Sequence, residues 1–420
     1  MRSVLRIALL TAGIVFGVEA VAHAQQPDSV FVVRHQGKRL LRLNTDGGFF
    51  VQGEDGVGQI PVEGAGTRMM WYPARGAFRA GVLTPDCCAN YWDAAQIGYG
   101  SVALGVNALA SGDVSFAVGH SAAATGPGSV ALGPFSIASG DTSFAIMGSA
   151  TGRGTVAIGL RSVAEGEYSV AVGVGAVATD EVTTAIGPGA YATGYATTAL
   201  GAGSRASGLH SIAIGWNAAT NWKRGAIVFS DYCSELPSDS VYATDDNQFV
   251  VRACGGYKLY TDAASTTGVE VAPGGGSWSS ISDVNRKENF EPLDGEVVLR
   301  RLREVPVTTW NYRTQDASIR HAGPTAQDFY AAFGLGESEQ LINTVDIDGI
   351  NMAAIKALEE RTTRQQERIE ALEEQTDRQR ARIEELEAEL AEHRRRIEML
   401  EKRAERLEQL RRDSNGAPRM

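Results

Sequence analysis

A short pattern recurs along residues 101–221, and its spacing can be counted. The motifs read SVALG, SFAVG, SVALG, SFAIM, TVAIG, SVAVG, TTAIG, TTALG and SIAIG. Their central alanines lie fourteen residues apart, with one step of twelve, at positions 103, 117, 131, 145, 157, 171, 185, 199 and 213. Such a regular period predicts stacked coils, because one unit cannot bury its apolar face without its neighbours.

Each unit contains two strand patterns. The motif above is followed by a strand of small residues, such as NALASG or GAYATG, with glycines at the turns. Strings such as GPGAYATG and GAGSRASG look superficially like phosphate loops. No helical pattern follows them, so we interpret their glycines as turn residues.

The repeat has the form S-[VF]-A-[VIL]-G followed by x-x-A-x-A-x-G. It resembles the head repeat of trimeric autotransporter adhesins of the YadA type. The resemblance implies that residues 97–221 form a left-handed parallel β-roll, and that three chains pack their rolls side by side. The expected fold class is mainly β with a C-terminal α part.

The segments beside the repeat also read as strands. Residues 28–60, within an N-terminal β region at 25–96, alternate apolar and polar side chains and predict a β-meander with a turn at 44–48. Residues 66–81 gather aromatic side chains and arginines, which could bind sugar or pack where the chain enters the repeat. We favour packing. Residues 222–281 predict a β-rich connector with a glycine-rich end.

Residues 351–413 carry a heptad pattern. Isoleucine and leucine dominate the a and d positions, from Ile355 and Leu358 to Leu407, with charged residues between them. Isoleucine at a with leucine at d favours two strands, whereas the head repeat implies three chains. Polar layers at Thr362/Gln365 and Thr376/Gln379 would fix the register. We expect a parallel trimeric coiled coil, then a disordered tail at 414–420.

The first 24 residues have the features of a signal peptide. Arg2 and Arg6 precede an apolar run, and Ala22 and Ala24 form an A-x-A cleavage site. A retained anchor is the alternative, but Glu19 interrupts the run. We therefore expect an exported protein, at the cell surface or extracellular, whose mature chain has no integral membrane segment. The net charge of −11 argues against nucleic acid as a partner.

The cysteines and acidic residues favour no metal or cofactor. Cys233 and Cys254 could form a disulfide across a short loop, whereas Cys87 and Cys88 are adjacent and harder to place. No C-x-x-C motif supports a zinc or redox site. The stretch VDIDGIN (345–351) resembles the start of a calcium loop but lacks its remaining ligands. We expect a turn there that leads into a helix at Asn351, and no cofactor.

The stretch SWSSISDVNRKENFEP (277–292) places Ser282 five residues before Lys287. Serine with lysine can perform acyl chemistry without histidine or metal. A lysine acts as a base only when its pKa lies well below about 10.4, which burial or a nearby positive charge such as that of Arg286 can cause. Attack by Ser282 on the Ile281 carbonyl would be intramolecular, so proximity would replace substrate binding.

Three motifs after that serine occur in a specific order. They are SDVNRKENFEPLDGEVVLRRLREVPVTTWNYR, HAGPTAQDFYAAFGLG and VDIDGINMAAIKALEER. Together they look like the intramolecular chaperone of endosialidases and phage tail spikes. The resemblance implies that residues 282–350 trimerise the fibre and cut themselves off in a single turnover at Ile281–Ser282. Ser282 would be the nucleophile and Lys287 its base.

Five other residues could affect the pair. Asn285 and Arg286 stand where many members have arginine and then an apolar residue, which puts the local packing of the pair in question. His321 stands where similar proteins often have a histidine beside the site, so it could position or stabilise the reacting group. Asn289 could donate to an oxyanion. Asp283 is expected to cap the turn rather than to act in catalysis.

These observations predict an exported, adhesin-like homotrimeric fibre with a self-cleaving C-terminal chaperone. Its expected partners are copies of itself and a ligand on a host or cell surface. The alternative is an uncleaved surface protein in which residues 282–350 serve only as a trimerisation hub. A polysaccharide hydrolase is the third possibility, but the repeats lack paired carboxylates in a plausible cleft.

Overall fold

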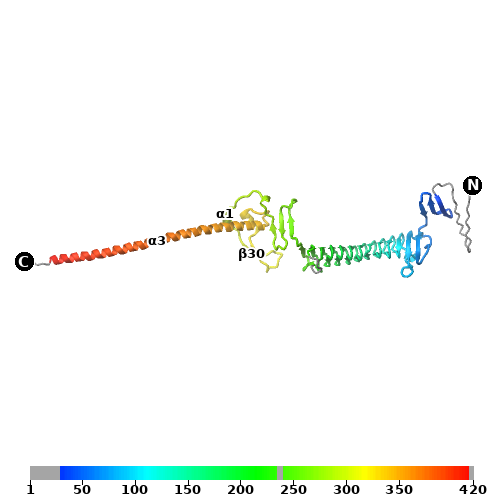
Figure 1. Cartoon of the computed structure of the whole chain (residues 1–420), viewed down its shortest axis with the longest axis horizontal. Coiled ribbons are helices and arrows are strands. Elements are labelled where there is room, and N and C mark those ends of the chain that lie inside the picture. The colour runs from blue at the N-terminus through cyan, green and yellow to red at the C-terminus, as the bar shows by residue number, and fades with distance from the viewer. Residues whose placement is uncertain (1–28, 234–239, 416–420) are drawn as a thin grey trace, which may run out of the picture. The chain divides into compact units, whose positions relative to one another are not determined.

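The computed structural model describes residues 29–233 and 240–415 (Figure 1). The predicted signal peptide, and residues 416–420 of the predicted tail, lie outside this part of the chain. The structure divides into two compact units, one reaching to Tyr257 with Val271–Ser277 added, and the other formed by Lys258–Glu270 and the chain from Trp278. No helix of the described residues is both long and apolar enough to cross a membrane.

The first unit begins with the predicted β-meander. Strands β1 (Ser29–His35), β2 (Lys38–Asn44) and β3 (Phe49–Val51) form an antiparallel sheet in that order. The turn at 44–48 is closed by the Asn44 amide, which donates to the Gly48 carbonyl at 2.7 Å.

A parallel β-solenoid follows, built from two sheets that alternate along the chain (Figure 1, cyan to green). The strands of the wide sheet carry the predicted motifs: β6 (Val102–Val106), β8 (Phe116–Val118), β10 (Val130–Leu132), β12 (Phe144–Ile146), β14 (Val156–Ile158), β16 (Val170–Val172), β18 (Thr184–Ile186), β20 (Thr198–Leu200) and β22 (Ile212–Gly215). The narrow sheet holds the strands of small residues: β7 (Leu109–Ala110), β9 (Ala123–Ala124), β11 (Ile137–Ala138), β13 (Ser149–Ala150), β15 (Val163–Ala164), β17 (Val177–Ala178), β19 (Tyr191–Ala192), β21 (Arg205–Ala206) and β23 (Ala218–Ala219).

Alanine fills the space between the two sheets. All nine predicted central alanines are fully buried. Each of the first eight pairs with the central alanine of the next coil, as Ala103 does with Ala117, and Ala213 pairs with Val228. The narrow sheet contributes a second buried column, in which Ala124 pairs with Ala138. Because both inward columns are alanine, the two sheets can approach closely, and the repeat register predicted from the sequence is confirmed.

The single twelve-residue step shortens a turn and leaves the strands in register. Residues 133–136 join β10 to β11, whereas only Met147 and Gly148 join β12 to β13. The Ser136 hydroxyl of the preceding coil accepts a hydrogen bond from the Met147 amide at 2.8 Å. Ala145 still pairs with Ala157, so the ladder continues through the deletion.

The solenoid extends beyond the predicted limits of 97 and 221. On the C-terminal side, β24 (Ile227–Ser230), β25 (Val241–Tyr242) and β26 (Phe249–Arg252) join the two sheets in parallel. On the N-terminal side, the hairpin of β4 (Gly66–Tyr72) and β5 (Ala77–Leu83) adds to β6. The limits at 96/97 and 221/222 therefore do not separate structural units, because backbone pairing continues where the motif has ended.

The arginine and aromatic cluster at 66–81 packs at the solenoid entry. Arg79 is fully buried and donates to the carbonyls of Ser101 and Ala110, both at 2.9 Å. Trp92 is also fully buried and donates to the Ala108 carbonyl at 2.7 Å. Burial lowers the pKa of Arg79 to about 10. These contacts satisfy carbonyls of the first coil, so Arg79 has a structural role rather than one in sugar binding.

The described chain contains two disulfides. Cys233 pairs with Cys254, as the sequence allowed, and the adjacent Cys87 and Cys88 are bonded to each other. Three short 3-10 turns lie at Pro73–Arg75, Ala94–Gln96 and Val284–Arg286.

The second unit combines short strands with helices. Its elements are β27 (Tyr257–Tyr260), β28 (Gly268–Val271), β29 (Ser279–Ser280), α1 (Gly295–Leu302), β30 (Thr308–Trp310), β31 (His321–Gly323), α2 (Ala326–Phe333) and α3 (Thr344–Asn415). Val298 of α1, Phe329 of α2, and Ile350 and Ala354 of α3 form its buried core. Glu296 of α1 also forms an ion pair with Arg361 of α3.

Helix α3 begins at Thr344. The prediction of a turn that leads into a helix at Asn351 is therefore wrong. The Asn343 side chain accepts a hydrogen bond from the Val345 amide at 2.9 Å and caps the first turn. Ile350 is buried in the core, with Ile347 packed against it. Burial of this face favours helix, and the helix also includes residues 414 and 415 of the predicted tail.

Replacing Gly126 with alanine should destabilise the solenoid. The added Cβ would lie well inside contact distance of the Gly140 carbonyl oxygen on the next coil, and backbone cannot move without breaking the ladder. We expect a loss of about 3 kcal/mol or more in the free energy of unfolding, measured by denaturant titration.

Gly175→Asn is the matched control, because Gly175 has open space around its Cβ position and a φ of +67°. Asn217 occupies the equivalent left-handed position with a φ of 50°. Equal destabilisation by Gly126→Ala and Gly175→Asn would contradict the close stacking of the coils.

Candidate functional site

The candidate site follows directly after a short β-hairpin. Strand β29 pairs with β28 in antiparallel fashion, with Val269 opposite Ser280. The Ile281 amide then donates to the Gly268 carbonyl at 3.1 Å, which extends the pairing by one residue. The backbone of Ile281 is thereby fixed to the hairpin, and Ser282 is the first residue beyond it.

A single 3-10 turn separates Ser282 from Lys287. The Asp283 carboxylate caps this turn by accepting hydrogen bonds from the Asn285 amide at 2.9 Å and the Asn285 side chain at 3.0 Å. These hydrogen bonds, chiefly the one from the backbone amide, lower the pKa of Asp283. The predicted capping role of Asp283 is confirmed.

The turn brings the two candidate catalytic residues into contact. The Lys287 ammonium donates to the Ser282 hydroxyl, with 2.6 Å between Nζ and Oγ. A neutral lysine at this position would be within reach of the hydroxyl proton. Both residues are exposed in the single chain, so the burial expected around a lysine base is absent from it.

Arg286 ties the turn to the loop between β27 and β28. Its guanidinium donates to the Thr266 carbonyl at 2.5 Å and forms an ion pair with Asp283 at 3.8 Å. That loop is itself held by Asp262, which accepts hydrogen bonds from the amides of Thr266 and Thr267 at 2.8 and 2.7 Å. Arg286 stands where many members of the resembled family have an apolar residue, and here it has a defined partner in the Thr266 carbonyl.

Sequence reasoning missed the contribution of this loop to the site. Its signal was an aspartate followed within five residues by serine and threonines, in TDAASTT, which is a typical turn pattern. The pattern could have predicted the loop itself. It could not have predicted that Arg286, twenty residues later, contacts it.

His321 lies in a different environment. It is on β31, where Nε2 and the Gln315 side-chain oxygen are 2.9 Å apart and its ring lies 4.9 Å from that of Trp310. Asn289 is exposed, with a φ of 55°. Within the described chain, no hydrogen bond joins His321 or Asn289 to Ser282 or Lys287.

The hydrogen bonds to Asp283 predict how the turn responds to acid. Because the folded pKa is lowered, the cap contributes stability above the unfolded value of about 3.9. That contribution is lost as the pH falls through the lower folded pKa. Carboxyl NMR should show Asp283 titrating below an ordinary aspartate, with the Asn285 amide shifting at the same pH. Titration of Asp283 at or above the ordinary value would contradict the capped turn.

Two segments match models of known families. Residues 282–334 match the family described as chaperone of endosialidase. Residues 97–122, 124–146, 150–176, 164–190, 181–204 and 192–218 match the YadA head domain repeat. A search of curated proteins found no match. The chain therefore carries YadA-type head repeats followed by a chaperone-of-endosialidase segment, a combination that indicates a trimeric adhesin-like protein with a self-cleaving peptidase-related domain.

Proposed function

We propose that this protein is an exported, homotrimeric, adhesin-like fibre whose residues 282–350 direct assembly and then release themselves by cutting the Ile281–Ser282 bond. The contact between Lys287 Nζ and Ser282 Oγ is the observation that carries this proposal. It occurs at the first residue of the chaperone match. Residues 282–350 form the released domain, with the coiled coil of residues 351–413 attached.

The reaction needs only atoms within this short segment. Neutral Lys287 takes the Ser282 hydroxyl proton while Oγ attacks the Ile281 carbonyl carbon. The peptide C–N bond breaks, the Ser282 nitrogen gains a proton, and an ester joins Ile281 to Oγ. Water then hydrolyses the ester, which leaves a carboxylate on Ile281 and a free amine on Ser282. His321 and Asn289 make no hydrogen bond to the pair in the described chain, so these steps are written with Ser282 and Lys287 alone.

The outer face of the wide sheet favours association of several chains. Because the central alanines point inward, the residues on either side of each alanine point outward. From Val102 to Ile214 these positions are apolar in every coil except for Thr184 and Thr198. Phe116 and Leu200 are 38% and 41% exposed. A continuous apolar face of this kind is typical of a subunit interface, and a second copy would bury it.

Helix α3 leads to the same conclusion. Its predicted a and d residues are exposed in the single chain, among them Ile369 at 49%, Ile383 at 55% and Leu386 at 46%. Charged residues occupy most other positions of residues 362–413, so the apolar stripe is the surface of that part of the helix that suits packing. Three parallel helices would cover this stripe and hold three chains in register while the solenoids form.

Assembly would also supply what the single chain lacks at the candidate site. Lys287 is exposed in one chain, and a lysine base needs an environment that disfavours its charged form. We propose that a neighbouring copy covers the Ser282–Lys287 pair in the trimer. Cleavage would then follow assembly, and loss of the chaperone would leave a trimer that cannot readily retrace its folding path.

Intact mass of the recombinant chain tests the cleavage. Wild type should give two fragments, the smaller beginning at Ser282, whereas Ser282→Ala and Lys287→Ala should each stay whole because the nucleophile or the base is missing. Ser280→Ala is the control, since Ser280 is an exposed serine of β29 two residues away. A trimeric wild-type chain that stays whole would refute self-cleavage.

The second candidate function is an uncleaved trimeric surface protein in which residues 282–350 form only a trimerisation hub. The exposure of Lys287 favours this alternative, because a solvated lysine is a poor base at neutral pH. The two candidates share the trimer and differ only in the fate of the Ile281–Ser282 bond.

Charged substitutions in the helical stripe test the trimer. Ile383→Glu combined with Leu386→Glu would place six carboxylates in the centre of a three-helix seam, so we expect the trimer to dissociate at micromolar concentration. Sedimentation equilibrium gives the mass. Ala388→Glu, five residues from Ile383 and outside the a and d positions, should leave the trimer intact. An unchanged mass for the double variant would exclude a coiled-coil seam at these positions.

A further inference from the structure

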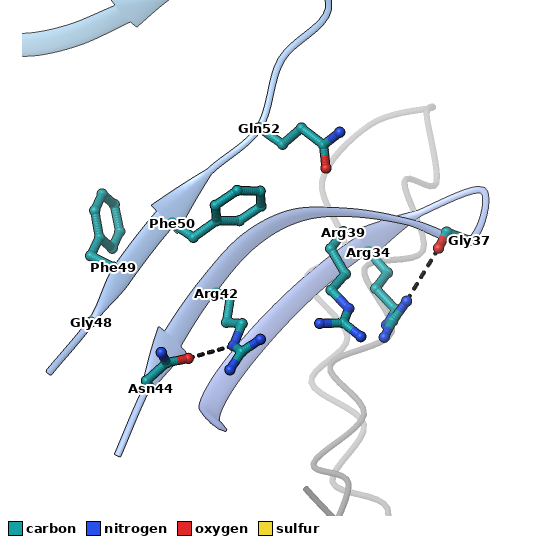
Figure 2. A pocket seen from close by; sticks show the side chains of 9 residues that line it. All are labelled: Arg34, Gly37, Arg39, Arg42, Asn44, Gly48, Phe49, Phe50 and Gln52. Carbon is teal, nitrogen blue, oxygen red and sulfur yellow. Dashed lines mark hydrogen bonds between the residues drawn. The ribbon is translucent and has the colours of Figure 1, made fainter. Parts of the chain in front are cut away.

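We propose that the face of the β1–β3 meander that carries three arginines binds an acidic carbohydrate, a sugar chain bearing carboxylate or sulfate groups. This face contains a hollow of about 630 Å³ (Figure 2). Arg34, Arg39 and Arg42 line it together with Phe50, Asn44 and Gln52. The proposal specifies a ligand class for the adhesin-like role and rests on that role, although the binding site itself requires neither cleavage nor the trimer.

A β-bulge places the three arginines on one face. Arg39 and Arg42 are three residues apart on β2, so a regular strand would direct them to opposite faces. The pairing register shifts, however: Val33 lies opposite Leu41, whereas the next residue, Arg34, lies opposite Arg39. Leu40 is therefore the extra residue of a bulge, which turns Arg39 toward the side of Arg42.

The register also assigns Arg34 to this face. Val32 lies opposite Arg42 and shares its side of the sheet, and Arg34 follows two residues after Val32 on β1. Figure 2 shows the three arginine side chains extending from the sheet in the same direction.

The charge of this face is not offset within the described chain. Arg34 donates to the Gly37 carbonyl and Arg42 to the Asn44 side chain, which are both neutral acceptors. Arg39 is half-buried, and among residues 31–233 and 240–413 it has no ion-pair or hydrogen-bond partner. Like charges directly opposite each other, as in Arg34 and Arg39, destabilise a strand pair. A bound oxyanion would relieve this repulsion and satisfy the guanidinium donors.

The remaining lining residues suit a sugar. Phe50 lies directly opposite Arg42, so an apolar ring stands beside the cations on the same face. Asn44 and Gln52 add amide groups that can bond to hydroxyls. Nucleic acid fits less well, because the arginines are confined to one hollow and do not form an extended basic stripe.

Titration calorimetry at low salt tests the proposal with three defined probes: oligogalacturonate for carboxylate, dextran sulfate for sulfate, and neutral dextran. We expect one or both acidic probes to bind and neutral dextran not to bind. Arg39→Gln and Arg42→Gln should each raise Kd about tenfold through loss of a charge-assisted hydrogen bond. Arg205→Gln, at an exposed arginine on solenoid strand β21, should leave Kd unchanged.

A second variant separates a sugar site from a simple anion site. Phe50→Ala should weaken binding of the acidic oligosaccharide and leave binding of inorganic sulfate unchanged. Equal weakening of both ligands, equal loss in Arg205→Gln, or tighter binding of duplex DNA or phosphatidylglycerol vesicles than of either acidic probe would overturn the proposal. Failure of a folded chain to bind either acidic probe would also overturn the proposal.

The same titration on Ser282→Ala keeps this test separate from that of cleavage. Ser282 belongs to the other compact unit, so the whole and the processed chain should bind the probe with equal Kd. A wild-type chain that stays whole but binds the probe would reject only the self-cleaving function, whereas a wild-type chain that is cleaved but does not bind the probe would reject only the arginine site.

Discussion

The fold of this protein depends on the contact between alanine columns inside the solenoid. Ala103 and its equivalents are fully buried and paired in register, so the two sheets can lie close together only while these positions stay small. The glycines at the turns follow from the same closeness, since a Cβ at Gly126 would meet backbone of the next coil. A slender core of this kind buries little apolar surface in each coil. Stability must therefore come from stacking many coils and, under the proposed function, from contacts between chains.

The two terminal coils of the solenoid need other contacts, because each has no neighbouring coil on one side. At the entry, Arg79 and Trp92 donate to carbonyls of the first coils, and the β4–β5 hairpin covers the edge. At the other end, β24 and β26 extend the wide sheet with larger side chains, including the buried Val228. An arginine and aromatic cluster that could have been read as a sugar site is in fact part of this closure.

The candidate catalytic pair depends on a different kind of constraint, which is almost entirely local. Six residues, one capping carboxylate and one 3-10 turn are sufficient to place Lys287 against Ser282. The hairpin fixes Ile281, and Arg286 links the turn to the Thr266 loop. This arrangement supplies proximity and orientation, but a single chain leaves the pair in water. Under the proposed function, the pair is shielded from water only when the chains have assembled. Cleavage would therefore occur only after assembly.

Local patterns in the sequence determined the repeat register, the heptads, the meander and the capped turn at Asp283, because each depends on residues close together in the chain. The Ser282–Lys287 contact belongs to this group, since only five positions separate the two residues. Tertiary structure decided the rest. The start of α3 at Thr344 depends on burial of Ile350 against α1 and α2, and the position of His321 depends on how β31 pairs with β30. The solenoid ends where backbone pairing ends, beyond the motif. The arginine face exists only because Leu40 bulges out of register, and a bulge is set by pairing between strands, which no single strand encodes.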